Sequence, residues 1–224
     1  MNVLLIGASR GLGAAIAAEY VDRGAHVVAT VRGSGRTPLH ELANERLEIE
    51  TVDINEPEQV RALRDRLDGR AFDLLFVNAG VTNNADETPA DVTTEEFTRL
   101  MITNALSPMR VIETLGDLVA PDGTLAVMSS GQGSIANNER GGFEIYRASK
   151  SALNQLMRSY AARARAEGRT LLLLAPGWVK TGLGGPGAKL TIGESIPSLV
   201  ATVDAQRGRP GLQYLDYLGR AVAW

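Results

Sequence analysis

Cysteine is absent from the 224-residue sequence, which excludes disulfide bonds and thiol nucleophiles. Histidine occurs only twice. His26 is expected to begin a strand and His40 to lie in a loop or short helix, so both are most simply structural. No apolar run approaches the roughly 18 residues that a membrane span needs. The short apolar run from Val3 to Ile6 has no basic region before it and no cleavage signal after it, so we do not expect a signal peptide.

The net charge is also small. The formal charge is −3 and the pI is near 5.5, which argues against nucleic-acid and anionic-membrane surfaces. Apolar residues make up 44% of the chain, an ordinary share for a globular protein with a sizeable core. We therefore expect a single cytoplasmic domain over residues 1–224, with no nucleic-acid partner and no membrane partner.

A strand, a glycine turn and a helix open the chain in the order that dinucleotide binding requires. Residues 1–8 carry the continuous apolar run of a strand that is buried on both faces. Gly7, Gly11 and Gly13 follow with the spacing G-x-x-x-G-x-G, and a helix then ends at Gly24. Glycines let the backbone approach a pyrophosphate, and a helix N-terminus favours its charge. The alternative is a merely tight turn.

The remaining chain alternates between strand and helix patterns, which predicts an α/β fold. Further strands are expected at residues 25–31, 47–52, 72–77, 124–128, 171–174 and 212–215. Helices are expected at 56–67, 94–119, 146–167 and 192–206, with a short helix or loop at 37–44, a turn at 121–123 and a substrate loop within 181–206. These elements predict a Rossmann-type, doubly wound, mostly parallel seven-stranded sheet with helices on both faces.

Basic residues occupy positions that determine whether a dinucleotide-binding fold prefers NAD or NADP. Arg32 directly follows the second strand, and Arg10 lies inside the glycine turn. The segment from Ala25 to Arg36 contains no acid, the residue type that commonly binds the ribose hydroxyls of NAD. Two arginines that converge on a 2′-phosphate favour NADP(H) over NAD(H). The alternative is that both are solvated loop residues.

Tyr146 and Lys150 are four residues apart and would share one face of a helix. The pKa of a free tyrosine is about 10, and lowering it by about three units takes roughly 4 kcal/mol, the scale of one close charge. Lys150 could supply that charge. Ser130 follows a separate apolar run and could hold a carbonyl oxygen. The three groups make a proton-transfer site without metal or histidine, although a Tyr-x-x-x-Lys pair alone is common in ordinary helices.

Short motifs follow one another in a fixed order: the glycine turn, Asn78-Ala79-Gly80, Asn104, Ser130, Tyr146 with Lys150, and Pro176-Gly177. This ordered set resembles the short-chain dehydrogenase/reductase family over nearly the whole chain. Within that family, the segments 129–135, 146–154 and 176–181 and the closing Trp224 are similar to the small carbonyl-reductase branch that includes sniffer and the bacterial C-factor.

The resemblance implies an NADP(H)-dependent enzyme that interconverts a small carbonyl compound and its alcohol. Tyr146 is then the general acid in reduction and the base in oxidation. Lys150 lowers its pKa and binds the nicotinamide ribose, while Ser130 orients the substrate oxygen. Asn104 holds a water of the proton relay behind Lys150. The implied cofactor contacts, besides Tyr146 and Lys150, are Gly7, Ser9, Arg10, Gly11, Leu12, Gly13, Arg32, Asp53, Ile54, Asn78, Ala79, Gly80, Pro176, Gly177, Val179 and Thr181.

Four positions leave alternatives open. Ile6 replaces the usual Thr before the first glycine, so a hydrogen bond that stabilises the turn could be missing. Val77 stands where a first Asn is common. Asp53 could meet the adenine or could cap the helix that follows it. The gap between Ser130 and Tyr146 is longer than usual, so Ser134 could compete for the serine role, although Ser130 ends the strand directly.

The substrate class and the oligomeric state are inferred by analogy with other proteins of this fold. A modest hydrophobic carbonyl compound is suggested by the candidate pocket residues Val81, Gln132, Phe143, Trp178 and Leu183. A homodimer or homotetramer could pack through the helices at 94–119 and 146–167, since Ala148, Ala152 and Ala161 are small. The rival functions are a dinucleotide sensor or signalling protein with little turnover and, with less support, a methyltransferase or an enoyl reductase.

Overall fold

The computed structural model describes residues 1–165 and 168–224 and contains one seven-stranded sheet of order β3-β2-β1-β4-β5-β6-β7. All neighbouring strands in this order run parallel. The α/β, doubly wound fold is therefore confirmed, with a sheet that is fully rather than mostly parallel. The strands are β1 (Asn2–Ile6), β2 (His26–Val31), β3 (Leu47–Thr51), β4 (Phe72–Val77), β5 (Val119–Met128), β6 (Thr170–Ala175) and β7 (Gly211–Asp216).

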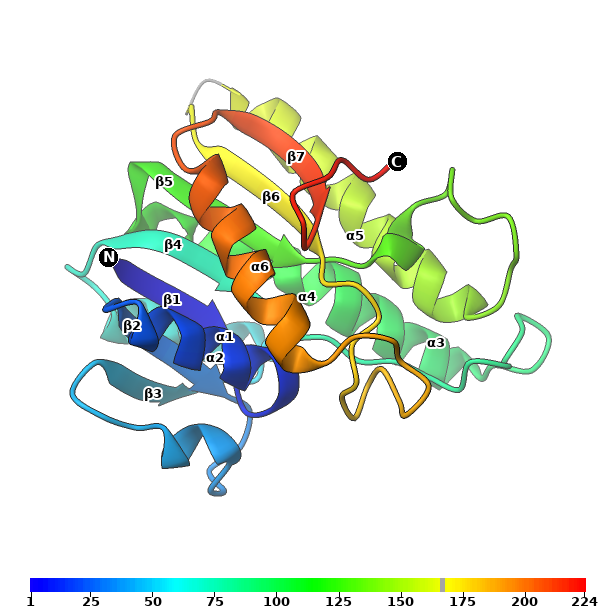
Figure 1. Cartoon of the computed structure of the whole chain (residues 1–224), viewed down its shortest axis with the longest axis horizontal. Helices are drawn as coiled ribbons and strands as arrows, with labels where there is room; N and C mark the ends of the chain where they lie inside the picture. Colours follow the sequence, from blue (N-terminus) through cyan, green and yellow to red (C-terminus); the bar gives the residue numbers. More distant parts are fainter. Residues whose placement is uncertain (166–167) are drawn as a thin grey trace.

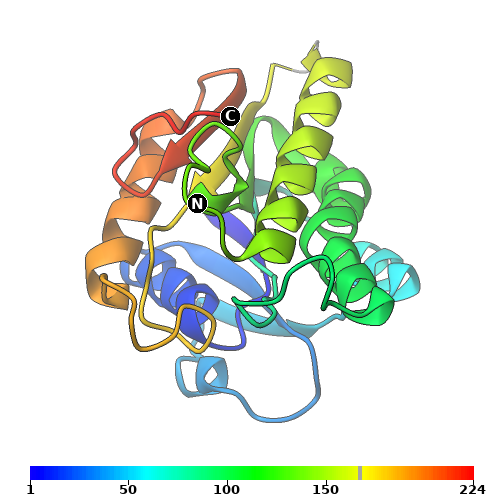
Figure 2. The same cartoon turned by 90° about the vertical axis from the view of Figure 1, so that its right-hand side faces the viewer.

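Helices cover both faces of the sheet (Figures 1 and 2). One face packs against α1 (Gly11–Asp22) and α6 (Ile192–Gln206), and the other against α2 (Pro57–Arg66), α4 (Ser107–Leu115) and α5 (Glu144–Arg163). Strand β1 is buried on both sides because its side chains alternate. Val3 and Leu5 join the first core, while Leu4 and Ile6 join the second. This is why its sequence is continuously apolar.

The long helix expected at 94–119 is interrupted. The structure has α3 (Thr94–Met101), a π-helical turn η2 (Ile102–Leu106), α4 and a short 3₁₀ turn η3 (Gly116–Leu118). Pro108 accounts for the interruption. It has no backbone N–H, and in a regular α-helix its ring would clash with the carbonyl four residues earlier, that of Asn104. Widening the turn to π geometry avoids that clash, so Pro108 is the sequence signal for the break.

Strand β5 begins earlier than expected, at Val119, and takes in the residues at 121–123 that were expected to form a turn. The pairing with β4 shifts there: Phe72 is opposite Val119, whereas Leu74 is opposite Thr124, so β5 advances five residues while β4 advances two. The extra residues of β5 bulge out of the hydrogen-bond ladder. Pro121 is one of them, and it has no backbone N–H to donate to the ladder.

The other element boundaries lie close to expectation. The short helix or loop expected at 37–44 contains a 3₁₀ turn, η1 (Pro38–Glu41). Helix α5 begins at Glu144 and ends at Arg163, and the expected end at residue 167 lies outside the described residues. Within 1–165 and 168–224, no helix has both the length and the apolar character to cross a bilayer.

Tyr20 allows a test of the core beneath α1 and α6. Its hydroxyl is buried and has no hydrogen-bond partner among the described residues. Removing an unsatisfied buried hydroxyl relieves its desolvation cost, so Tyr20→Phe is expected to keep the free energy of unfolding or raise it by up to about 1 kcal/mol. Urea denaturation measures this. A loss of more than about 1 kcal/mol would contradict the assignment, and Phe76→Ala, expected to lose about 3–5 kcal/mol, calibrates the assay.

Candidate active site

Helix α5 presses a tyrosine and a lysine against the end of β5. Tyr146 is 8% exposed and Lys150 is 3% exposed. The Lys150 ammonium donates a hydrogen bond of 2.9 Å to the carbonyl oxygen of Met128, the last residue of β5, and lies 5.9 Å from the centre of the Tyr146 ring. Burial lowers the pKa of Lys150 to about 8. Lys150 is therefore a weakly basic amine at the carboxyl edge of the sheet.

Tyr146 is held in its neutral form. Burial raises the pKa of Tyr146 to about 12, and a hydrogen bond from the Ser130 side chain opposes that rise. Lys150 is not among the causes of this shift, and its ammonium donates to the Met128 carbonyl, so the expected lowering of the Tyr146 pKa by Lys150 stays a prediction. At neutral pH the phenol therefore carries its proton and can give it away.

Asn104 lies in the π-helical turn and is completely buried. Its Oδ1 accepts a hydrogen bond from the Val81 backbone N–H at 2.8 Å, and its Nδ2 donates to the Val81 carbonyl at 2.9 Å and to Ser149 Oγ at 3.0 Å. Ser149 in turn donates to the Tyr146 carbonyl at 2.7 Å. Asn104 thus connects the loop after β4 to α5. A methyl group on Gly80 would lie 3.3 Å from Asn104 Oδ1 and 3.5 Å from Lys150 Nζ, so these two groups face the same glycine.

Three polar residues that support Asn104 were not predicted from the sequence: Asn55, Thr103 and Ser107. Asn55 donates to Thr103 Oγ1 at 3.0 Å and accepts from the Ser107 hydroxyl at 2.9 Å, so it spans the π-helical turn that carries Asn104. Asn55 comes from the loop after β3, and its distance along the chain hides the contact. Pro108 is the one local signal that the turn is irregular.

The glycine turn after β1 is closely packed. A methyl group at Gly13 would collide with the Gly7 carbonyl and lie 2.7 Å from Asn78 Nδ2, which itself donates to that carbonyl at 2.7 Å. Gly7 has a φ of 88°. The hydrogen bond expected to be lost at Ile6 is replaced, because Gly7 N–H donates to Thr30 Oγ1 of β2 at 2.9 Å.

The N-terminus of α1 is suited to an anion. Arg10 occupies the N-cap position without a side-chain cap, and the first turn contains no acid. Gly11 has a φ of 57°, and a methyl group there would meet nothing closer than Thr181, at 3.8 Å. Arg10 and Arg32 are exposed, and neither side chain has a hydrogen bond or ion pair with any residue in 1–165 or 168–224. The turn thus has open space, free N–H groups and unpaired cations.

The loops after β3 and β6 complete this edge of the sheet. Asp53 Oδ1 accepts a hydrogen bond from the Asn55 N–H at 2.9 Å, and the N-cap of α2 is Glu56, so Asp53 does not cap that helix. Ile54 beside it is buried. Thr181, which faces Gly11, accepts from the Gly184 N–H at 3.0 Å, and the Pro176 carbonyl accepts from Ser195 Oγ at 2.7 Å.

The candidate pocket residues separate into two groups. Val81 and Phe143 pack against Tyr146 in one apolar cluster. Trp178 and Leu183 are half exposed on the loop after β6, where Trp178 Nε1 donates to the Gly184 carbonyl at 2.7 Å. Phe143 adopts a left-handed backbone with a φ of 52°, an uncommon state for a residue that is not glycine.

The two candidate serines differ in their surroundings. Ser134 is buried, and its hydroxyl accepts from the Asn137 N–H at 3.1 Å, which closes a local turn. Ser130 lies directly after β5. Its hydroxyl also accepts from a nearby backbone group, the Gln132 N–H at 3.1 Å, but its side chain bonds to Tyr146 as well. This geometry favours Ser130 for the serine role. Gln132 Oε1, two residues further on, is buried and has no hydrogen-bond partner in the described part of the chain.

Comparisons with known proteins agree with this arrangement. Residues 7–193 match the family model described as enoyl-(acyl carrier protein) reductase. The chain is 36% identical over 154 residues to the C-signal of Myxococcus xanthus, covering 68% of this chain and 92% of that protein. The chain therefore belongs to the short-chain dehydrogenase/reductase family of oxidoreductases.

Solved structures match the whole fold. A short-chain dehydrogenase/reductase of Burkholderia multivorans with bound NADP is 60% identical, with a TM-score of 0.98, and the match covers 100% of this chain and 99% of that one. A carbonyl reductase of Pseudomonas aeruginosa in complex with NADP is 37% identical, with a TM-score of 0.91 and the same coverage.

Gly13 and Gly33 form a matched pair for testing the glycine turn. Gly13→Ala is expected to lower the free energy of unfolding by about 1–3 kcal/mol, because the added methyl overlaps the Gly7 carbonyl. Gly33→Ala has open space around it and is expected to change stability by less than about 0.5 kcal/mol. Urea titration of both variants compares them. Equal stabilities would mean that the turn can open without cost.

Proposed function

We propose that the protein is an NADP(H)-dependent carbonyl reductase in which Tyr146 is the general acid. The observation that carries this proposal is the gathering of Asn104, Ser130, Tyr146 and Lys150 at the carboxyl ends of β4 and β5, three of them buried. In open parallel sheets, ligands bind beyond this edge. When bound there, the nicotinamide would supply the hydride for reduction or accept it in the reverse reaction.

The chain's own residues would manage the proton. Tyr146 is neutral at pH 7 because its pKa is raised to about 12, so it holds the proton that a reduced carbonyl oxygen requires. Ser130 would hold the substrate oxygen beside the phenol. Lys150, with its pKa lowered to about 8, can hold or release a proton near neutral pH. Asn104 and Ser149 would keep the loop after β4 in register with α5.

The preference for NADP(H) is supported by Arg10 and Arg32. Both guanidinium groups are exposed, and both are unpaired within the described ranges, so neither must break an ion pair to bind a phosphate. Gly7, Gly11 and Gly13 with the N-terminus of α1 would hold the pyrophosphate. Asp53 and Ile54 would border the adenine, Asn78, Ala79 and Gly80 the ribose, and Val179 and Thr181 the carboxamide.

The substrate would be a modest hydrophobic carbonyl compound. Val81 and Phe143 supply an apolar wall next to Tyr146, and Gln132 Oε1 offers a buried acceptor without a partner in the described chain. Trp178 and Leu183 would contribute from the loop after β6. A second function, sensing or signalling through the bound dinucleotide with little turnover, is favoured by the similarity to the C-signal.

Turnover decides between these functions. NADPH oxidation is expected with some members of a panel of aldehydes, ketones and diketones, and Tyr146→Phe is expected to lower kcat at least about 100-fold, the usual contribution of a general acid. Tyr20→Phe is the matched control, because it removes a phenol on the other face of the sheet. Tight NADPH binding without turnover on any carbonyl would favour the sensor. Turnover confined to an α,β-unsaturated thioester would point to an enoyl reductase.

Cofactor choice is tested separately. Arg32→Asp is expected to weaken NADPH binding about 10- to 100-fold, the size of one charge-assisted hydrogen bond of about 1.5–3 kcal/mol, while NADH binding changes far less. Fluorescence titration of both cofactors measures the difference. Arg110→Asp, an equal charge change at an exposed position of α4, is the control. Equal losses for NADPH and NADH would show that Arg32 does not contact the 2′-phosphate.

A further inference from the structure

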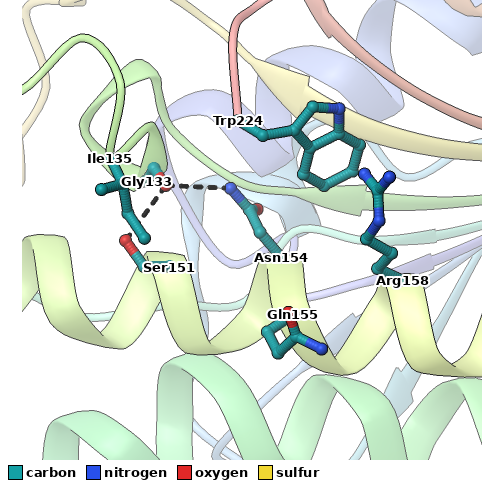
Figure 3. A pocket seen from close by; sticks show the side chains of 7 residues that line it. All are labelled: Gly133, Ile135, Ser151, Asn154, Gln155, Arg158 and Trp224. Carbon is teal, nitrogen blue, oxygen red and sulfur yellow. Dashed lines mark hydrogen bonds between the residues drawn. The ribbon is translucent and has the colours of Figure 1, made fainter.

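One side chain of α5 holds both ends of the turn that carries Ser130. Asn154 Oδ1 accepts a hydrogen bond from the Ser129 hydroxyl at 2.6 Å, and Asn154 Nδ2 donates to the Gly133 carbonyl at 3.2 Å. Ser151, one turn earlier, donates to the same carbonyl at 3.0 Å (Figure 3). Because Ser130 lies between Ser129 and Gly133, its position depends on these bonds.

The turn also packs directly on α5. A methyl group on Gly133 would lie 2.9 Å from Asn154 Nδ2 and 3.1 Å from the backbone carbon of Lys150. From the other side, the Tyr214 hydroxyl of β7 donates to the Ser130 carbonyl. The turn is therefore enclosed between α5 and β7 and has little freedom to move alone.

Asn154 belongs to the same buried face of α5 as the proton-transfer pair. It follows Lys150 by four residues and Tyr146 by eight, and it is 4% exposed. Positions four apart lie on one side of a helix. The helix that carries Tyr146 thus also carries the group that fixes Ser129 and Gly133.

Asn154 also borders a pocket of about 310 Å³, together with Arg158 and Trp224 (Figure 3). The Arg158 guanidinium stacks 4.5 Å above the Trp224 ring, and the Trp224 and Tyr214 rings are 5.4 Å apart. Asn154 itself is only 4% exposed, so little water competes for its hydrogen bonds.

We propose that Asn154 is a positioning residue that sets Ser130 against Tyr146 by clamping the 129–133 turn onto α5. This inference rests on the proposed reductase function. The Ser130 hydrogen bond favours the phenolate of Tyr146 and so lowers its pKa. Loosening the clamp removes that effect, and the Tyr146 pKa then rises.

Asn154→Ala is the test, and Gln155→Ala is the matched control. Gln155 is exposed and borders the same pocket, and among the described residues its side chain bonds only to Ser159. We expect Asn154→Ala to lower kcat for carbonyl reduction about 10- to 100-fold, because small misplacements of reacting groups have effects of this size. The KM for NADPH is expected to change less than twofold. Gln155→Ala is expected to leave both constants unchanged.

The pH profile separates positioning from simple loss of structure. Reduction needs the protonated phenol, so kcat falls as pH rises through the Tyr146 pKa. Loss of the Ser130 hydrogen bond raises that pKa, so the alkaline limb of the Asn154→Ala profile is expected to move to higher pH. An unchanged limb, or an equal shift in Gln155→Ala, would overturn the proposal.

Hydrogen–deuterium exchange tests the clamp without turnover. Asn154→Ala is expected to speed exchange of the amides at 130–134, and Gln155→Ala is not. If Asn154→Ala fails to fold, Ser129→Ala removes one of the two bonds and is expected to speed exchange at the same amides by a smaller factor. Unchanged exchange there would overturn the clamp. A wild-type protein without carbonyl turnover would instead refute the proposed function, and the exchange result would still decide the clamp.

Discussion

The hydrogen bond from the Lys150 ammonium to the Met128 carbonyl ties the main helix of the site to the end of a central strand. A buried ammonium is costly unless its donors are bonded, so this contact fixes how closely α5 approaches β5. Two glycines from different loops pack near Lys150. A methyl group on Gly80 would be in ordinary contact with Lys150 Nζ at 3.5 Å, whereas one on Gly133 would lie only 3.1 Å from the Lys150 backbone carbon and 2.9 Å from Asn154 Nδ2. The close approach of α5 therefore requires glycine at position 133.

A second constraint comes from Pro108. The missing N–H and the clash with the Asn104 carbonyl force a wide turn into an otherwise regular helix. That turn lets a polar side chain point inward from the middle of a helix, where Asn104 bonds to both backbone groups of Val81. Asn55 then bonds to Thr103 within the turn and to Ser107 just after it. A local defect in the helix is thus stabilised by three polar residues that converge from another loop and from the helix itself.

The sheet could be read from sequence because its strands are buried on both faces. Continuous apolar runs such as Val3 to Ile6 predict a parallel sheet, and the glycine turn marks where the first strand ends. The helix break at Ile102–Leu106 was missed although Pro108 signals it locally. The bulge in β5 was missed because it depends on how β5 pairs with β4. Local propensity does not contain that information.

The candidate site, like the fold, could be predicted from the sequence only in part. The structure brings Asn104, Ser130, Tyr146 and Lys150 together, and these residues stand in recognisable motifs. Their supports are single polar residues without a spacing pattern. Thr30, which bonds to Gly7 across 23 residues, is one example, and Asn154, which reaches Ser129 across 25, is another. A contact between distant residues on neighbouring elements becomes visible only once the register of the strands and helices is fixed.

Arg10 and Arg32, which lie in the glycine turn and directly after β2, differ from other arginines of the chain in their charge pairing. Arg23, Arg64, Arg66 and Arg70 each have a carboxylate within 3.1 Å. Arg10 and Arg32 have no such partner within the described residues, although the chain as a whole is acidic. Screening limits surface charges to a range of about 10 Å, so the net charge says little about the potential at one edge of a sheet. A chain of net charge −3 can therefore repel polyanions and still present a local site for a single phosphate.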